Sequence, residues 1–97
     1  MDHLNVAFDV DGTLITGRDT PNDPVIALLK WFLAQNHNVH IWSGGGLEYT
    51  QHWADKLGFH GVRIIEKSKQ SAMHYNINLT VDDMPVEFGQ GILNIQV

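Results

Sequence analysis

Hydrophobic and polar positions alternate along the chain in blocks of two different periods. The first block predicts a short strand that starts at residue 4 and ends at Asp9. An irregular stretch over residues 13–22 follows. In the next block the apolar residues recur with the spacing of an amphipathic helix of about three turns, and they are Val25, Leu28, Leu29, Phe32 and Leu33. Asp23 is placed to cap this helix, with Pro24 at its first position.

The alternation continues toward the C-terminus. A second strand over residues 39–42 stops at Ser43 and a run of three glycines. The residues that share an apolar face in the helix expected next are Leu47, Thr50, Trp53, Ala54 and Leu57. Gly58 is placed to cap the C-terminus of that helix. The remaining pattern predicts a third strand, a short helix, a fourth strand and a fifth strand, over residues 62–65, 69–75, 77–81 and 92–97.

This order of elements predicts an α/β fold. Helices between successive strands imply a mainly parallel, five-stranded sheet flanked by helices, a Rossmann-like three-layer sandwich. No repeat, low-complexity tract or linker divides the chain, so residues 1–97 are expected to form a single domain. In such sheets ligands bind beyond the carboxyl ends of the strands, which is where Asp9, Ser43 and Asp82 fall.

Composition narrows the function classes. The chain is 43% hydrophobic and 18% charged, so it can fill a core and is not disordered by composition. Its net charge of −5 disfavours broad binding to nucleic-acid backbones or anionic membranes. The absence of cysteine excludes thiol catalysis, cysteine-ligated zinc and iron–sulfur clusters. The N-terminus has neither a basic region nor an apolar run, so a soluble, cytoplasmic protein without a membrane span is expected.

Four acidic residues are the main candidates for chemistry. Asp9 and Asp11 are two apart at a strand end, so extended backbone would project both side chains to the same side. Asp82 and Asp83, at the end of another strand, would join them at the same edge of the sheet. Carboxylates this close need a counter-charge, and Mg²⁺ fits a sparse set of oxygen ligands. Either pair alone would be read as a turn, but the two pairs together favour a metal site.

Other candidates carry less weight. Gly44 opens a glycine run before a helix, and helix N-termini attract anions, although such runs more often serve as turns. The six histidines show no helical spacing of metal ligands, so they are interpreted as structural or exposed. The aromatic residues are interpreted as packing residues rather than base-stacking platforms. Among them, Trp42 is the one placed beside Ser43, where it can line a site.

The run Phe8-Asp9-Val10-Asp11-Gly12-Thr13-Leu14 resembles the first motif of the haloacid dehalogenase superfamily of phosphoryl-transfer enzymes. Members of that family also carry a Ser or Thr after the second strand, a lysine at the start of a later helix, and an acidic pair at the end of the fourth strand. The matching residues here are Ser43, Lys69 or Lys67, and Asp82-Asp83. All four motifs occur in the family's order, and the resemblance extends from the first strand to residue 85.

The resemblance implies a phosphomonoester hydrolase that depends on Mg²⁺. Asp9 would be the nucleophile that forms an aspartyl phosphate, and Asp11 the general acid/base. The implied metal-site residues are Asp9, Asp11, Asp82 and Asp83, although adjacent side chains at a strand end diverge and only one of the last two is expected to bind directly. The phosphate would be met by Ser43, by Lys69 or Lys67, and by backbone N–H groups around Gly12, Thr13 and Gly44. Lys69 is preferred because Lys69-x-x-Ala72-Met73 is similar to the pattern of many members.

The family commonly inserts a cap domain after the first motif or after the second strand, and this chain has no residues to build one there. The site should be open, so it would admit a small or macromolecular phosphate, or would need a second copy to cover a small substrate. A phosphatase acting on nucleic-acid ends is a further alternative, disfavoured by the acidic charge. A different class of function also stays open: a non-catalytic, phospho-accepting or metal-binding regulatory domain with the same pocket.

Overall fold

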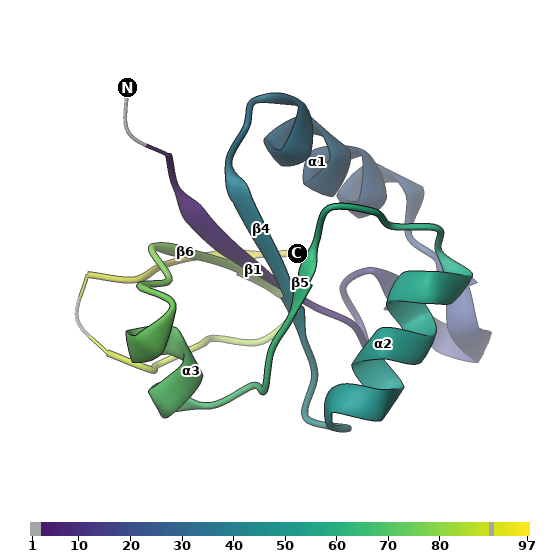
Figure 1. The fold of residues 1–97 in the computed structure, drawn as a ribbon. Helices are drawn as coiled ribbons and strands as arrows, with labels where there is room; N and C mark the ends of the chain where they lie inside the picture. The colour runs from purple at the N-terminus through teal and green to yellow at the C-terminus, as the bar shows by residue number, and fades with distance from the viewer. Residues whose placement is uncertain (1–2, 90) are drawn as a thin grey trace.

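The computed structural model describes residues 3–89 and 91–97 of the chain. Its centre is a five-stranded sheet in which all neighbouring strands are parallel, in the order β5-β4-β1-β6-β7 (Figure 1). The strands are β1 (Asn5–Asp9), β4 (Asn38–Trp42), β5 (Arg63–Ile64), β6 (Leu79–Asp82) and β7 (Leu93–Gln96). The helices are α1 (Asp23–Ala34), α2 (Leu47–Lys56) and α3 (Lys69–His74). The predicted α/β sandwich is confirmed.

Different elements cover the two faces of the sheet. Side chains alternate along β1, so Phe8 points into the larger core, formed with α1 and α2, and Ala7 into a smaller one. The smaller core lies under α3 and the loop that joins β6 to β7. There the fully buried Trp42 packs edge-on against Phe88, with ring centroids 5.5 Å apart. Trp42 is therefore a packing residue as well as the neighbour of Ser43.

A residue with a positive φ follows the C-terminus of each helix. Gly58 follows α2 with a positive φ of 75°, and its N–H donates to the Asp55 carbonyl oxygen at 3.1 Å. The next N–H, of Phe59, reaches back to the Ala54 carbonyl oxygen at 2.9 Å, which completes a Schellman motif. The predicted glycine cap is thus confirmed. Asn36 and Asn76 end α1 and α3 in the same left-handed conformation.

Three local predictions are corrected. The cap of α1 is Asn22 rather than Asp23, and the Asn22 side-chain amide donates to the Thr13 carbonyl oxygen at 2.9 Å, tying the helix start to the preceding loop. That loop is not irregular throughout: it holds an antiparallel hairpin of β2 (Ile15–Thr16) and β3 (Thr20–Pro21) around a 3₁₀ turn, η1 (Gly17–Asp19). β6 starts later than predicted because the Ile77 N–H is used to end α3.

The helices are short relative to a lipid bilayer. Within residues 3–89 and 91–97, none has the length and apolar character that crossing a membrane requires.

Candidate active site

The carboxyl ends of the central strands bring three predicted residues together. β1 and β6 end in Asp9 and Asp82, and Ser43 directly follows β4, which lies beside β1. All three are buried, with only 6%, 1% and 3% of their surfaces exposed for Asp9, Asp82 and Ser43. Burial of two carboxylates at one edge costs free energy unless an opposite charge accompanies them.

Lys67 supplies that opposite charge. Its Nζ atom lies 3.1 Å from Asp9 Oδ1 and 2.8 Å from Asp82 Oδ2, and its side chain is 21% exposed. Burial alone would lower the pKa of Lys67, but the hydrogen bond to Asp82 and the charge of Asp9 more than offset burial, so the net effect raises that pKa. The lysine therefore stays cationic between the two carboxylates.

The pKa of Asp9 is raised to about 6. Burial is the largest cause, and the charge of Asp82 adds to it, whereas the charge of Lys67 and its hydrogen bond act in the opposite direction. The Asp9 carboxylate is thus ionised at neutral pH yet close to the point where it takes up a proton. A carboxylate in this state is poorly solvated and is a better nucleophile than one in open water.

Thr13 links Asp9 to the loop after β6. Its hydroxyl lies 3.4 Å from Asp9 Oδ2, within reach to donate, and accepts the Asp83 N–H at 3.1 Å. The neighbouring Met84 N–H donates to Asp82 Oδ1 at 2.9 Å, which fixes that carboxylate from its second oxygen. These bonds hold the acidic pair in one position relative to β1.

The three carboxylates of Asp9, Asp82 and Asp83 each offer an oxygen, and these oxygens lie within 4.8 Å of one another. With all three ionised and Lys67 cationic, two negative charges remain, which is the charge that one divalent cation neutralises. Oxygen-only donors suit Mg²⁺ better than zinc or copper. The set therefore fits the predicted magnesium ion, and both members of the acidic pair belong to it.

The backbone at Gly12 lies directly against the Asp83 carboxylate of this cluster. Its φ of 78° lies in the left-handed region, and a Cβ atom at this position would overlap the Asp83 carboxylate. Any side chain here would displace Asp83 from the cluster and strain the backbone as well. This explains physically why glycine stands after Asp11.

Asp11 lies outside the cluster. Its side chain is exposed, and its Oδ1 atom accepts a hydrogen bond from the Tyr49 hydroxyl at 2.6 Å. β1 ends at Asp9, and the Val10 carbonyl oxygen accepts from three successive N–H groups, those of Thr13, Leu14 and Ile15. The chain is therefore turning at Asp11, and the extended-backbone argument that placed both aspartates on the same side does not apply there. The structure does not bring Asp11 to the other three carboxylates.

Ser43 and the glycine run form one wall of an adjoining pocket of about 450 Å³. Lys67 also lines this pocket, and the remaining lining residues are Gly44, Gly45, Gly46, Leu47, Glu48 and Glu66. The Ser43 hydroxyl oxygen accepts the Gly45 N–H at 3.0 Å, which leaves its own proton free to be donated. Nothing would meet a Cβ at Gly44, so backbone there is open to a ligand.

Lys67, not Lys69, meets the carboxylates, and the preference for Lys69 is corrected. Ser68 caps α3 by accepting the Ser71 N–H at 3.1 Å, so Lys69 is the first helical residue. Lys69 lines another cavity, beside Met73 and Phe88, between α3 and the loop after β6. Lys67 lies just before the cap, and its Nζ atom reaches the carboxylates at the sheet edge. Among the described residues, no histidine joins the carboxylate cluster.

Tyr49 is the site residue that sequence reasoning missed. It lies in the first turn of α2, where an aromatic residue is typical of helix packing, and its ring also packs beside Gly45. The hydrogen bond with Asp11 raises the pKa of the Tyr49 hydroxyl. No signal in the sequence distinguished it from the other aromatic residues.

Comparison of the chain with protein-family models, with curated proteins and with solved structures finds no match. The resemblance to the haloacid dehalogenase superfamily therefore rests on the four motifs in the sequence.

Proposed function

We propose that the chain hydrolyses phosphomonoesters with the help of Mg²⁺ and that Asp9 is its nucleophile. The observation that carries the proposal is the pair of buried carboxylates, Asp9 and Asp82, joined by Lys67 at the carboxyl edge of the sheet. A surface ion pair has no need of such burial, and perturbed carboxylates in this position are typical of reactive groups.

The reaction would take place in two displacements at phosphorus. In the first, an Asp9 carboxylate oxygen forms a bond to phosphorus, the bond from phosphorus to the ester oxygen breaks, and the leaving oxygen takes a proton from Asp11. In the second, water attacks the same phosphorus, gives a proton to Asp11, and inorganic phosphate leaves as Asp9 is regenerated. Each displacement is easier than direct attack of water on the ester.

The remaining residues would stabilise the charge on the transferred phosphoryl group. Lys67 already lies at Asp9, and the Ser43 hydroxyl and the open backbone at Gly44 lie in the adjoining pocket. Asp9, Asp82 and Asp83 would hold the magnesium ion, which supplies positive charge to the phosphate oxygens. Because the pocket is open, it does not restrict the size of the alcohol that leaves the phosphomonoester.

Asp11 would have to turn away from Tyr49 to act as the acid. Rotation about its side-chain bonds is a fast motion for an exposed residue, and the bound ester would provide the new partner.

The hydrogen bond between Asp11 and Tyr49 favours the second candidate function, a phospho-accepting or metal-binding domain without turnover. With Asp11 kept at Tyr49, Asp9 could be phosphorylated by a reactive donor, while both the exit of a poor leaving group and hydrolysis would lack their acid/base.

The test is release of phosphate from a panel of phosphomonoesters, with and without Mg²⁺, by the wild type and by Asp9→Asn. Asp55→Asn is the matched control, since Asp55 is an exposed carboxylate on α2 whose hydrogen bond comes from Gln51. The proposal expects turnover that requires Mg²⁺, is lost in Asp9→Asn and is unchanged in Asp55→Asn. Magnesium binding without turnover on any ester would favour the second candidate instead.

A further inference from the structure

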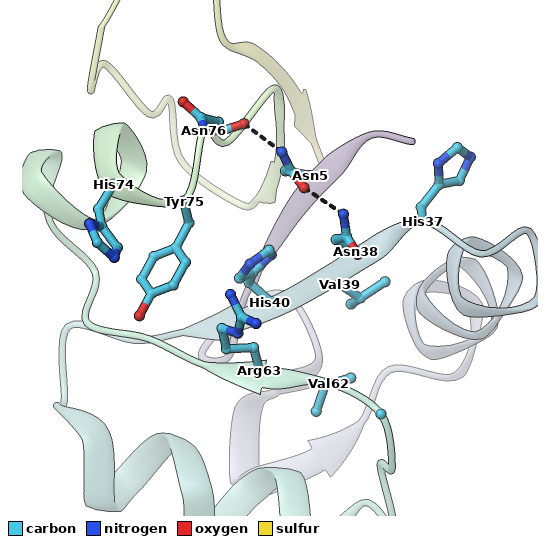
Figure 2. A pocket seen from close by; sticks show the side chains of 11 residues that line it. Asn5, His37, Asn38, Val39, His40, Val62, Arg63, His74, Tyr75 and Asn76 are labelled. Atoms are coloured by element: carbon cyan, nitrogen blue, oxygen red, sulfur yellow. Dashed lines mark hydrogen bonds between the residues drawn. The ribbon is translucent and has the colours of Figure 1, made fainter. Parts of the chain in front are cut away.

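A third cavity, of about 590 Å³, lies at the opposite end of the sheet from the carboxylates. Figure 2 shows the side chains that line it. It is bounded by the first residues of three strands and by the C-terminal end of α3; the residues used below are Asn5, Asn38, His40, Arg63, His74 and Tyr75. Strand geometry puts Asn5 about 13 Å from Asp9 along β1. The cavity is therefore separate from the proposed active site.

Asparagine side chains hold the floor of this cavity in place. The Asn38 amide donates to Asn5 Oδ1 at 2.9 Å, and the Asn5 amide donates to the Asn76 carbonyl oxygen at 3.0 Å (Figure 2). Each of these amide groups has two N–H donors and uses one in these bonds, so each keeps a second for another partner. The result is a fixed row of donors at the start of β1 and β4.

Tyr75 lies at the centre of a group of cationic and titratable side chains. The Arg63 guanidinium lies over the Tyr75 ring, 5.1 Å from its centroid. The rings of His40 and His74 lie 5.5 and 4.7 Å from the same ring. Stacking on the ring restricts the arginine, which lowers the entropy that a ligand would have to remove on binding.

His40 is the buried member of this group, with 3% of its surface exposed. Its Nδ1 atom lies 3.2 Å from the Val6 carbonyl oxygen, which holds the ring in position. Burial lowers the pKa of His40, and the charge of Arg63 lowers it further, although the backbone hydrogen bonds act in the other direction. Among the residues that the structure describes, the titratable groups that line the cavity are His37, His40, Arg63, His74 and Tyr75, with no carboxylate. The ring of His37 points away from the others in Figure 2.

We propose that this cavity binds a small organic anion, with a phosphate or carboxylate group placed between Arg63 and His40. Arginine, histidine and amide donors line this cavity although the chain as a whole carries a net charge of −5. Its volume lies in the range of small-molecule sites. An anion beside His40 would offset the effect of Arg63 and favour the charged ring, so binding takes up a proton.

The test is a residue-resolved NMR titration of the full chain carrying Asp9→Asn, which prevents turnover of the probes. The probes are inorganic phosphate, citrate and adenosine monophosphate, each at pH 6 and at pH 8. The proposal expects saturable shifts at His40 and Arg63 for at least one probe, with a dissociation constant of about 1 mM or tighter at pH 6. Binding should be weaker at pH 8, because the proton that is taken up on binding is less available there.

Arg63→Met removes the charge and keeps an aliphatic stem over Tyr75, and Lys30→Met is the matched control on the exposed face of α1. Arg63→Met should weaken binding at least about tenfold, and Lys30→Met should leave it unchanged. The identity of the probe that binds then separates phosphate from carboxylate ligands. The proposal is overturned if no probe shifts His40, if all shifts fall at Ser43 and Lys67, or if Arg63→Met binds as the wild type does.

Discussion

The carboxyl ends of the strands hold three acidic side chains and one lysine, whereas the described residues that line the cavity at their amino ends include an arginine, histidines and asparagines but no carboxylate. Both groups follow from one property of a parallel sheet: the residues that end strands meet at one edge, and those that begin strands meet at the other. Asp9 and Asp82 are last residues of their strands, and Asn5, Asn38 and Arg63 are first residues.

Burial acts on both edges in the same sense, because it favours the neutral form of each group. It raises the pKa of Asp9 at one edge and lowers that of His40 at the other. The edges differ in the neighbouring cation. Lys67 opposes the effect of burial on Asp9, whereas Arg63 adds to the effect of burial on His40. In the two proposals the carboxyl edge would bind a cation and a phosphate, and the amino edge an anion.

The largest effect is expected from Lys67→Met. It leaves Asp9 and Asp82 buried without their cation, which should cost about 2–3 kcal/mol of unfolding free energy, less than a fully buried pair because Lys67 is partly exposed. Turnover should fall about a thousandfold. Lys69→Met, two residues away, should change unfolding by less than about 0.5 kcal/mol. Chemical unfolding measures the change in stability, and phosphate release measures the change in turnover. Equal losses of stability and turnover in Lys67→Met and Lys69→Met would contradict the assignment of Lys67.

At the amino edge, Arg63→Met should leave turnover at the carboxyl edge unchanged, since the guanidinium contacts Tyr75 rather than any of the carboxylates. A loss comparable to that of Lys67→Met would show that the two edges do not act separately.

Magnesium should stabilise the fold through the carboxyl edge alone. At a free concentration a hundred times its dissociation constant, the gain in unfolding free energy is expected to be about 2.7 kcal/mol. Asp82→Asn should reduce this gain, because it removes one of the three clustered carboxylates. Thermal unfolding across a magnesium titration gives the measurement, with Asp55→Asn as control. A melting temperature that stays the same across the magnesium titration would refute the metal site.

Lys67 opposes the effect of burial on the pKa of Asp9, and Arg63 adds to its effect on the pKa of His40. Both pKa values can be measured by titration in the absence of magnesium. The Asp9 carboxyl should titrate near 6, above the ordinary value of 3.8, and His40 below its ordinary 6.5. Carbon NMR of the two side chains follows each group directly. A nucleophile must be ionised, and bound magnesium favours the ionised carboxylate. The kcat/KM measured with magnesium should therefore fall at a pH below that at which Asp9 titrates without the metal. An Asp9 titration at or below 3.8 without magnesium would remove the case for a desolvated nucleophile.

Tyr49→Phe should change turnover much less than Lys67→Met does. Asp11 must leave the Tyr49 hydroxyl before it can serve as the acid, and that hydrogen bond to a charged group is worth about 1.5 kcal/mol. Removing it should raise kcat by up to about tenfold with little change in KM. Steady-state kinetics test this, with Tyr75→Phe at the other edge as the control. A large fall in kcat would instead make Tyr49 a residue that positions Asp11 for reaction.

The order of elements and the meeting of Asp9, Ser43 and Asp82 followed from the sequence because periodicity reports strands and helices, and parallel strands align their ends. The start of α3 at residue 69 was predicted, and Lys69 was preferred over Lys67 because of its similarity to the family pattern. In the structure Ser68 caps α3, and the Nζ atom of Lys67, just before the cap, contacts Asp9 and Asp82. That contact depends on how the segment between β5 and α3 packs against the sheet edge, which no local pattern reports.

The direction of the Asp11 side chain could not be predicted in this way. It depends on a turn in which one carbonyl oxygen accepts three N–H groups, and on a tyrosine 38 positions away in the chain. The hairpin before α1 was missed because its strands have two residues each, too few for an alternating pattern. The amino-edge cavity depends on Asn5, Asn38 and Tyr75, which come together only when the strands and α3 are packed.

The central claim is that Asp9 takes up the phosphoryl group, and acid quenching during turnover tests it most directly. The wild type is mixed with magnesium and its best phosphomonoester, quenched, and digested, and peptides are examined by mass spectrometry for a phosphorylated aspartate. The account predicts the modification on Asp9, dependent on magnesium, with none in Asp9→Asn and a normal amount in Asp55→Asn. Phosphorylation of another residue during turnover would contradict the claim. So would a burst of product with no phosphorylated residue at all.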